Sequence, residues 1–230
     1  MKKIQILLMT LMVSATPVAF AEILEVYNWK ANPGQAQKML SVMNESAEIH
    51  RALGAQVTIN LLDVGSENQV DYVVRFDDMK QWGSFKDSLT TDKKWNDLWA
   101  KVSRKPTGEL QMSLVGINTD SSVKASDFDQ PFVYGVWVWD PATGRTADVM
   151  AIQQKYKEVH ESLGARVEIY SEGPGGTGSF HYCMLFNSWS DWADWSIKAD
   201  SSNELAELNS QYDPSAATLV RSFSGRTVSN

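Results

Sequence analysis

The sequence predicts an α+β protein built from two tandem β-α-β-β-α-β repeats that pack sheet to sheet. The first observation is a duplicated motif: His-Arg-Ala-Leu-Gly-Ala-Gln-Val-Thr-Ile at 50–59 returns as His-Glu-Ser-Leu-Gly-Ala-Arg-Val-Glu-Ile at 160–169. At the same offset of 110, residues 23–99 match 133–209 at 15 of 77 positions without a gap. The second observation is that strand-like and helix-like hydrophobic periods follow one another in the same order in both copies. Both observations indicate a repeated unit of about 100 residues.

Each unit opens with a strand and a helix. Residues 23–29 and 133–139 are short and rich in β-branched and aromatic types, which is typical of strands. The next segment of the first unit has a helical apolar stripe formed by Ala36, Met39, Leu40, Met43, Ala47, His50 and Leu53. The second unit has a corresponding stripe of Val149, Met150, Gln153, Tyr156, His160 and Leu163. Gly54 and Gly164 then stand where a helix usually ends in a left-handed cap.

A hairpin follows each first helix. Its strands are predicted at 56–62 and 70–76 in the first unit and at 166–171 and 180–186 in the second, with turn-forming residues between them. Capping residues Asp77-Asp78 and Asn187-Ser188 then start a second helical region in each unit. Further helical segments near 93–102 and 203–211 lead to last strands near 110–115 and 218–223.

The segment 117–132 is polar, shows no hydrophobic period and separates the two units. We therefore expect a first domain over 22–116, a linker over 117–132 and a second domain over 133–230. A single unit would leave one face of its sheet bare, so we expect each to be unstable alone. Two units can cover each other's sheets, which buries apolar side chains that neither hides by itself.

The N-terminal segment has the pattern of a secretory signal. Lys2 and Lys3 precede an apolar run, 4–13, and a small-x-small site ends at Ala21. We expect residues 1–21 to be a cleaved signal peptide and the protein to be periplasmic or secreted. The apolar run is too short to span a bilayer, and no cysteine follows it for lipid attachment, so we expect no membrane anchor in the mature chain.

Net charge and cysteine count limit the kinds of partner and of stabilisation that we expect. The formal net charge of −7 becomes more negative once Lys2 and Lys3 are removed, which disfavours nucleic acid as a partner. Cys183 is the only cysteine, so an internal disulfide is excluded. Stability must come from packing, and a small molecule is the partner we expect.

The His-x-x-Leu-Gly-Ala turn, the Tyr-x-x-x-Phe third strand and the tryptophan of the following helix carry a resemblance to a known superfamily. With them the chain resembles the dimeric α/β-barrel superfamily of ferredoxin-like domains, which contains the antibiotic-biosynthesis monooxygenases and NIPSNAP-like proteins. The resemblance covers about 23–225 and implies two fused copies forming a pseudo-dimeric barrel within one chain. It leaves the activity open, because members include cofactor-independent oxygenases, haem proteins and units without assigned activity.

The haem-degrading branch of that superfamily pairs a strand asparagine with a helical tryptophan and a helical histidine. Asn28, Trp82 and His50 supply these residue types. His50, however, ends the first helix rather than lying in the second helical region, and Val138 replaces Asn28 in the second unit. We do not carry that site over, predict no cofactor or metal, and leave haem open as a ligand.

His50 and His160 are the catalytic candidates, because both units keep histidine on the apolar stripe of the first helix. Each is interpreted either as a base or ligand lining a cavity, or as a structural residue that stabilises the helix end through a backbone carbonyl or a nearby acid. The structural interpretation is favoured, since His181 is the only other histidine. A zinc site is disfavoured for the same reason.

Aromatic residues supply the ligand-binding candidates, which are Trp29, Trp82, Trp139, Trp192, Tyr72 and Tyr182. Most of the nine tryptophans have the spacing of a helix core face, so core packing is their first interpretation. The leading functional hypothesis is binding of a small apolar or aromatic molecule between helices and sheet. The alternatives are a cofactor-independent oxygenase of the antibiotic-biosynthesis monooxygenase type and a non-catalytic interaction module.

Overall fold

The structure, a computed structural model, describes residues 21–66 and 68–229. The predicted signal peptide, 1–21, therefore lies outside the described residues except for Ala21. No helix in the described part of the chain is both long and apolar enough to cross a bilayer.

The two halves of the chain have the same order of elements. The first half contains β1 (Ile23–Ala31), α1 (Ala36–Ala52), β2 (Gln56–Leu62), β3 (Gln69–Phe76), α2 (Met79–Thr91), α3 (Lys93–Val102) and β4 (Gly108–Asn118). A short 3₁₀ helix, η1 (Ala125–Phe128), follows. The second half contains β5 (Val133–Pro141), α4 (Thr146–Ser162), β6 (Arg166–Glu172), β7 (Phe180–Phe186), α5 (Trp189–Asp200), α6 (Asn203–Ser210) and β8 (Ala217–Ser229).

Local signals explain where the helices stop and start. Gly54 and Gly164 follow α1 and α4 with φ of 92° and 108°, the left-handed conformation expected after a helix. The side chains of Asp78 and Ser188 accept hydrogen bonds from backbone N–H groups in the first turns of α2 and α5. The last strands, β4 and β8, are longer at both ends than the segments predicted from the sequence.

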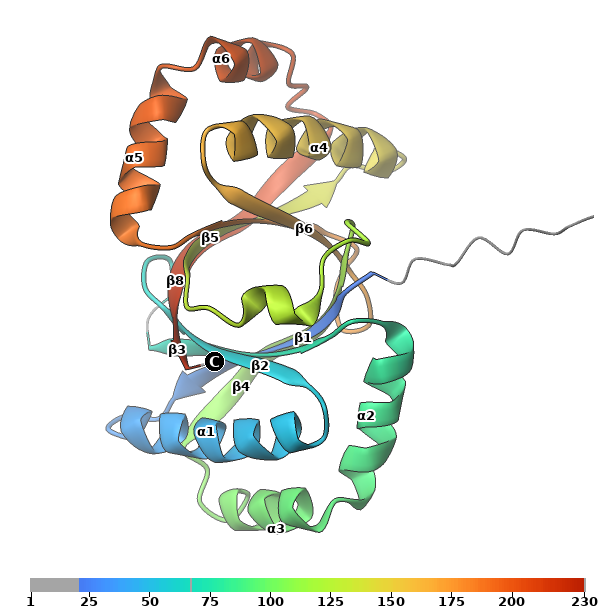
Figure 1. The fold of residues 1–230 in the computed structure, drawn as a ribbon, viewed down its shortest axis with the longest axis vertical. Coiled ribbons are helices and arrows are strands. Elements are labelled where there is room, and N and C mark those ends of the chain that lie inside the picture. Colours follow the sequence, from blue (N-terminus) through green and yellow to red (C-terminus); the bar gives the residue numbers. More distant parts are fainter. Residues whose placement is uncertain (1–20, 67, 230) are drawn as a thin grey trace, which may run out of the picture.

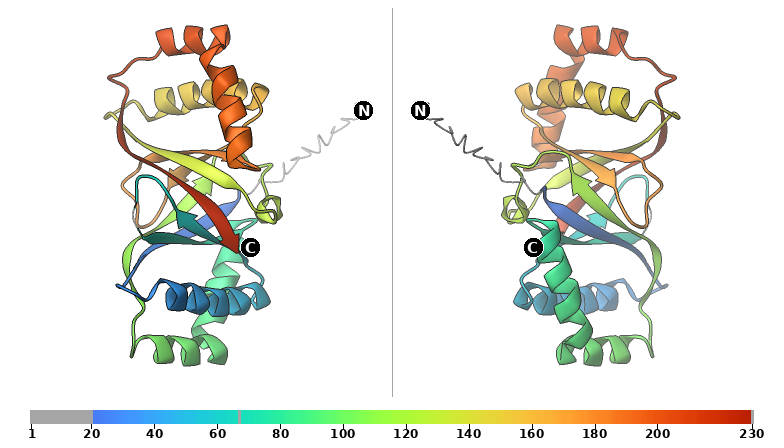
Figure 2. Two further views of the ribbon diagram at one scale, coloured as in Figure 1. Left: turned by 90° about the vertical axis from the view of Figure 1, so that its left-hand side faces the viewer. Right: turned by 90° about the vertical axis from the view of Figure 1, so that its right-hand side faces the viewer.

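The strands close into one antiparallel barrel in the order β1-β3-β2-β8-β5-β7-β6-β4, and β4 pairs back onto β1. Each half contributes four adjacent strands, which join the other half through the β2–β8 and β4–β6 pairs. Helices α1, α2 and α3 lie outside one half of the barrel and α4, α5 and α6 outside the other (Figures 1 and 2). The predicted α+β class and the antiparallel sheet are confirmed.

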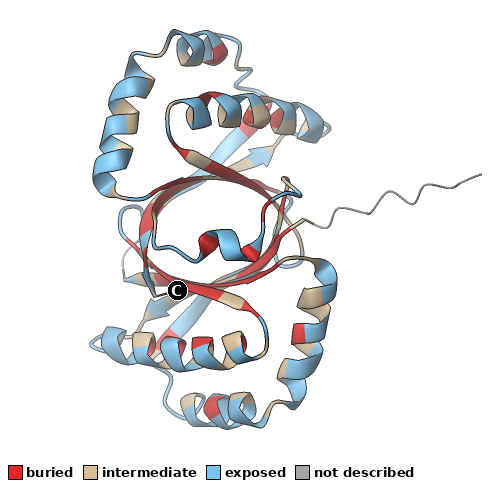
Figure 3. Cartoon of the chain, viewed as in Figure 1, coloured by how far each residue is buried: buried red, intermediate tan, exposed pale blue. Residues whose placement is uncertain are grey.

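Two apolar cores lie between the helices and the outer wall of the barrel. One includes Met39, Ala47, Val57, Ile59 and Phe76, and its counterpart in the second half includes Val149, Val167, Ile169, Met184 and Phe186. In Figure 3 the barrel wall is the most continuously buried part of the chain, whereas the outer faces of the helices are exposed. The helices are therefore held by the faces that they turn toward the barrel.

The barrel interior contains charged side chains in addition to the buried apolar side chains that we expected. Apolar side chains such as Leu62, Val136 and Leu185 do lie there. Charged groups lie there as well: Arg75 Nη1 is 2.6 Å from Glu22 Oε1, and both side chains are buried. A closed barrel removes these residues from water, and ion pairing offsets the cost of that burial.

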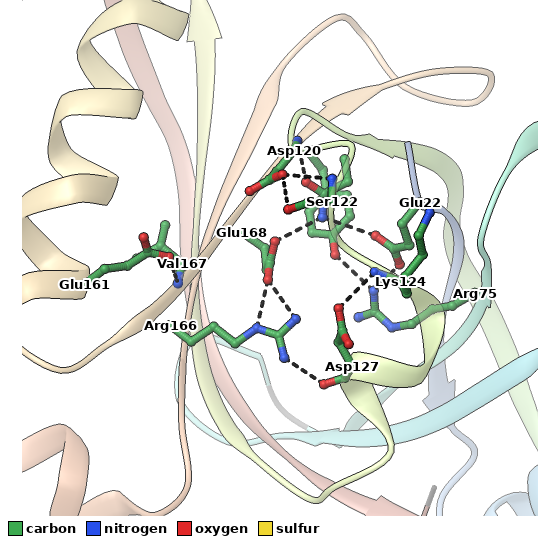
Figure 4. A network of polar contacts seen from close by, with 12 residues as sticks. Glu22, Arg75, Asp120, Ser122, Lys124, Asp127, Glu161, Arg166, Val167 and Glu168 are labelled. Carbon is green, nitrogen blue, oxygen red and sulfur yellow. Dashed lines mark hydrogen bonds and ion pairs between the residues drawn. The ribbon is translucent and has the colours of Figure 1, made fainter. Parts of the chain in front are cut away.

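The segment predicted as a linker, 117–132, begins with the last two residues of β4 and then crosses one end of the barrel (Figure 1). Phe128 of η1 is 1% exposed, and its ring centroid lies 3.6 Å from the guanidinium of Arg75 and 4.4 Å from that of Arg166. Figure 4 shows the polar network around this end, in which Arg166 bridges Glu168 and the backbone oxygen of Asp127. The segment is thus packed into the fold.

Candidate functional site

Two cavities lie between the helices and the outer wall of the barrel, one in each half. The N-terminal pocket has a volume of about 480 Å³ and the C-terminal pocket about 390 Å³. Ligand sites usually have volumes of roughly 300 to 1,000 Å³ and mostly apolar walls with a few polar groups. Both cavities match that description, whereas the cavity inside the barrel is much smaller, about 80 Å³.

The N-terminal pocket is formed by β1, β3, α1 and α3, with contributions from α2 and the start of β4. Its walls are mainly aromatic and aliphatic side chains, including Tyr27, Trp29, Met39, Met43, Tyr72, Phe85, Trp95, Leu98 and Trp99. The polar side chains that line it include His50, Glu25 and Ser46.

The C-terminal pocket is built from the corresponding elements, β5, β7, α4 and α6, together with α5 and the start of β8. Its apolar lining includes Trp137, Trp139, Val149, Ile152, Tyr182, Met184, Trp195 and Leu205. The polar side chains that line it include His160, Gln153 and Asn209. Neither pocket has a lysine or arginine among its described lining residues.

Each pocket contains a histidine–tyrosine pair. Nδ1 of His50 lies 2.9 Å from the hydroxyl of Tyr72, and Nδ1 of His160 lies 2.9 Å from the hydroxyl of Tyr182. The histidine comes from the last turn of the first helix of each half, and the tyrosine comes from the third strand. The same hydrogen-bonded pair thus occurs twice, on opposite sides of the barrel.

Both pairs are uncharged at neutral pH. Burial lowers the pKa of His50 and of His160 to about 4, and burial also raises the pKa of Tyr72 and Tyr182 above the ordinary value for tyrosine. A neutral imidazole and a neutral phenol can donate or accept hydrogen bonds. A histidine with a pKa near 4 is, however, a weak base at pH 7.

The N-terminal pocket also holds one compensated carboxylate. Glu25 accepts hydrogen bonds from Trp82 Nε1 at 2.8 Å, Lys86 Nζ at 2.9 Å and the Tyr27 hydroxyl at 2.7 Å. Burial opposes ionisation, but these hydrogen bonds outweigh it and lower the pKa of Glu25. Glu25 is therefore ionised, and its charge is balanced by Lys86.

The C-terminal pocket has no counterpart of that carboxylate, because Gly135 occupies the position 110 residues after Glu25. A Cβ on Gly135 would lie 2.7 Å from the rings of Trp137 and Trp192, so indole rings fill the space. The two pockets share their histidine–tyrosine pairs but differ in their other polar groups.

Most of the candidate residues predicted from the sequence line these pockets. His50, Tyr72 and Trp29 line the N-terminal pocket. Their equivalents His160, Tyr182 and Trp139 line the C-terminal pocket. The remaining two candidates, Trp82 and Trp192, do not line either pocket. Trp82 donates a hydrogen bond to Glu25, and Trp192 stacks on Phe186 with 5.2 Å between ring centroids.

One sequence interpretation needs correction. We expected a ring nitrogen of each histidine near a backbone carbonyl or an acid, but the partner of Nδ1 is a tyrosine hydroxyl in both halves. Only the backbone of His50 stabilises the helix end: its backbone oxygen accepts from the N–H groups of Leu53 and Ala55. The ring faces the barrel wall instead, because His50 lies on the buried stripe of α1.

Several lining residues were not among the candidates, notably Glu25, Trp95, Gln153 and Trp195. A signal for Gln153 was present in the sequence, since a glutamine interrupts an otherwise apolar helical stripe. A signal for the tyrosine partners was also present, because Tyr72 follows His50 by 22 residues and Tyr182 follows His160 by the same interval.

The residues do not match a haem site. Asn28 donates to Asp71 at 2.6 Å in the barrel interior, so it lies on the opposite side of the wall from His50 and Trp82. The His50 ring is packed against the rings of Phe85 and Trp95 at centroid distances of 5.2 and 4.7 Å. The pocket linings also offer no described lysine or arginine to pair with haem propionates, so we derive no chemistry through haem.

Nowhere in residues 21–66 and 68–229 do three or more histidine, cysteine, aspartate or glutamate side chains lie where they could hold a metal ion together.

Solved structures of other proteins share this fold across almost the whole chain. A candidate monooxygenase from Fusobacterium nucleatum superposes with a TM-score of 0.62 at 10% identity, over 91% of this chain and 93% of that one. An anthrone oxidase-like protein gives 0.56 at 12% identity, over 90% and 91%. A chlorite dismutase variant from Candidatus Nitrospira defluvii gives 0.52 at 8% identity, over 90% and 91%.

No protein-family model matches the chain, and no curated protein matches it. The structural matches establish a ferredoxin-like dimeric α/β-barrel fold, as the sequence resemblance implied. At 8 to 12% identity these matches are evidence for the fold and not for the activity.

Proposed function

We propose that the protein is an exported binding protein for a small, flat, largely apolar molecule, which it holds between helices and barrel wall. The observation that supports the proposal is the pair of aromatic-lined pockets, each of which contains an uncharged histidine–tyrosine pair. The rings supply stacking and apolar contact, and the pair supplies a directional hydrogen bond.

The lining also indicates the charge of the ligand. No described lining residue of either pocket carries an uncompensated charge, because Glu25 is paired with Lys86 and the C-terminal pocket has no charged lining residue among those described. Transfer of an ionised ligand into such walls would be unfavourable. We therefore expect a neutral ligand.

Calorimetric titration with 2-naphthol, a neutral two-ring phenol, tests the proposal. We expect two sites per chain. Val42 and Ile152 are equivalent lining residues of the two pockets, so Val42→Trp and Ile152→Trp should each remove one site, and the double variant should remove both. Absence of binding to the folded wild type, or binding that survives in the double variant, would refute it.

A cofactor-independent oxygenase is the second candidate. The duplicated histidine–tyrosine pair favours it, and structural neighbours named monooxygenase and anthrone oxidase-like support it loosely. In such a reaction, anthrone and O₂ would give anthraquinone and water, with His50 or His160 taking the proton from the substrate carbon. The low basicity of both histidines makes binding the better-supported function.

Oxygen consumption with anthrone separates the two candidates. An enzyme would consume one O₂ per anthrone, and it would do so faster than the uncatalysed reaction. His50→Ala and His160→Ala would then lower the catalysed rate. A binding protein would leave the uncatalysed rate unchanged. A catalysed rate unaffected by either substitution in folded protein would remove the proposed role of these residues.

We further propose that the two halves are fused equivalents of the two subunits of a dimer. The constant offset of 110, the shared order of elements and the placement of one pocket in each half support this. The barrel needs both halves, because β2 and β4 pair with strands of the second half.

A further inference from the structure

The two pockets differ at the positions where hydrogen bonds to a ligand would form. In the C-terminal pocket, Gln153 of α4 is 5% exposed, and neither its Nε2 nor its Oε1 has a hydrogen-bond partner among the described residues. Nε1 of Trp195, another lining residue, is also buried without a described partner. This wall therefore carries two unused donors and one unused acceptor.

The N-terminal pocket has apolar side chains at both equivalent positions. Met43 stands 110 residues before Gln153, and Phe85 stands 110 residues before Trp195. Both are buried in the apolar core of the first half and both line its pocket. The unpaired buried nitrogen of that pocket is Nε2 of His50. At these two positions the second half therefore has polar groups and the first half has none.

Unpaired buried amides destabilise a fold, because they lose hydrogen bonds to water and gain none in return. Gln153, Tyr156 and His160 share one face of α4, at spacings of three and four residues, and all three line the pocket. A ligand that satisfies the Gln153 amide would therefore lie beside the His160–Tyr182 pair and within the aromatic walls.

We propose that the C-terminal pocket selects an aromatic ring system bearing a cyclic amide, or an equivalent adjacent donor and acceptor, whereas the N-terminal pocket has no preference for that group. The ligand N–H donates to Gln153 Oε1, and the ligand carbonyl accepts from Gln153 Nε2 or Trp195 Nε1. This inference rests on the proposed function and adds the ligand class for one of its two sites.

The test compares 2-quinolone, a two-ring cyclic amide, with naphthalene, which has the same fused two-ring skeleton and no polar group. Val42→Trp places an indole in the N-terminal pocket to obstruct it, so calorimetry on that variant is designed to measure the C-terminal pocket. There we expect 2-quinolone to bind about tenfold more tightly than naphthalene, which corresponds to about 1.4 kcal/mol. In Ile152→Trp, where the N-terminal pocket remains, we expect the two affinities to agree within about threefold.

Variants that copy one pocket into the other supply the matched controls. Added to Val42→Trp, Gln153→Met copies Met43 and should lower 2-quinolone affinity about tenfold while changing naphthalene affinity less than about twofold. Trp195→Phe, which copies Phe85, should also lower 2-quinolone affinity. Without ligand, Gln153→Met should raise the melting temperature, because it removes the unpaired amide.

The outcomes separate this inference from the proposed function. If naphthalene binds and 2-quinolone has no preference for the C-terminal pocket, or if Gln153→Met leaves the preference intact, only the inference is overturned. If neither compound binds folded protein, the proposed function fails together with it.

Discussion

His50 and Tyr72 join the end of α1 to the middle of β3 through a hydrogen bond of 2.9 Å between Nδ1 and the hydroxyl. His160 and Tyr182 repeat this bond at the same length in the second half. The two copies differ in environment, because His50 is 4% exposed whereas His160 is half-buried. Equivalent substitutions in the two pairs should therefore lower the free energy of unfolding by different amounts.

Tyr72→Phe should destabilise the protein more than Tyr182→Phe. Loss of the Tyr72 hydroxyl leaves a buried imidazole nitrogen unpaired, which costs about 1 to 3 kcal/mol. Water can replace the lost partner of the more exposed His160, so Tyr182→Phe should lose less stability than Tyr72→Phe. Urea denaturation of both variants at pH 7 measures the difference, and equal losses would contradict the assigned burial of the two pairs.

His50 should make stability depend on pH between about 6.5 and 4. The unfolded chain takes up a proton on this residue below about pH 6.5, whereas the folded chain does so only below about 4, because burial lowers the pKa. Acidification through this window therefore favours unfolding, by up to about 3 kcal/mol. In urea denaturation at pH 7, 5.5 and 4, His50→Gln should lose stability less steeply than wild type. Parallel pH profiles would show that His50 is not buried in its neutral form.

Asp71 should have the opposite pH dependence. Its burial in the barrel raises its pKa to about 6, against the hydrogen bond from Asn28 and the charge of Arg221. The folded chain thus binds a proton between about pH 3.8 and 6 where the unfolded chain does not, and stability falls as pH rises through that window.

Asp71→Asn should remove this penalty. We expect it to stabilise the protein by up to about 3 kcal/mol at pH 7.5 and hardly at all at pH 4. Asp63→Asn, at an exposed position, is the control and should change stability little at either pH. If Asp71→Asn stabilises the protein equally at both pH values, the stabilisation comes from packing and not from removal of a buried charge.

The sequence could predict the strands and the helix ends, because these depend on local patterns: apolar alternation, helical stripes and the glycines at 54 and 164. It could also indicate the candidate residues, since His50, Tyr72 and Trp29 recur at an offset of 110. The hydrogen bond between His50 and Tyr72 was not predicted, because local patterns do not show which strand residue faces a given helix residue.

The barrel interior could not be predicted from local patterns. Asp71 and Arg75 alternate with Tyr72, Val74 and Phe76, a pattern typical of a strand with one face in water. The face that carries the charges is buried only because β2 pairs with β8 and β4 with β6, which are contacts between the two halves. Likewise, the polar composition of 117–132 indicated a linker and gave no sign that Phe128 would be buried in contact with two guanidinium groups.

Phe128→Ala tests the structural role of that segment. Removal of a fully buried phenylalanine side chain should cost about 3 to 5 kcal/mol, through lost burial and the cavity that remains. Phe132→Ala, at a half-buried neighbour whose ring centroid is 6.2 Å away, should cost clearly less. Thermal and urea denaturation of both variants provide the comparison. Equal, small losses would mean that the segment is a dispensable connection.

The central claim is that ligands bind between helices and barrel wall, and a crystal structure of the protein soaked with 6-bromo-2-naphthol tests it most directly. Anomalous scattering from bromine locates the ligand independently of any starting coordinates. The account predicts one bromine peak beside His50, Trp29 and Trp95 and one beside His160, Trp139 and Trp195. Peaks confined to the barrel interior or the outer surface, or no peak at saturating ligand, would contradict it.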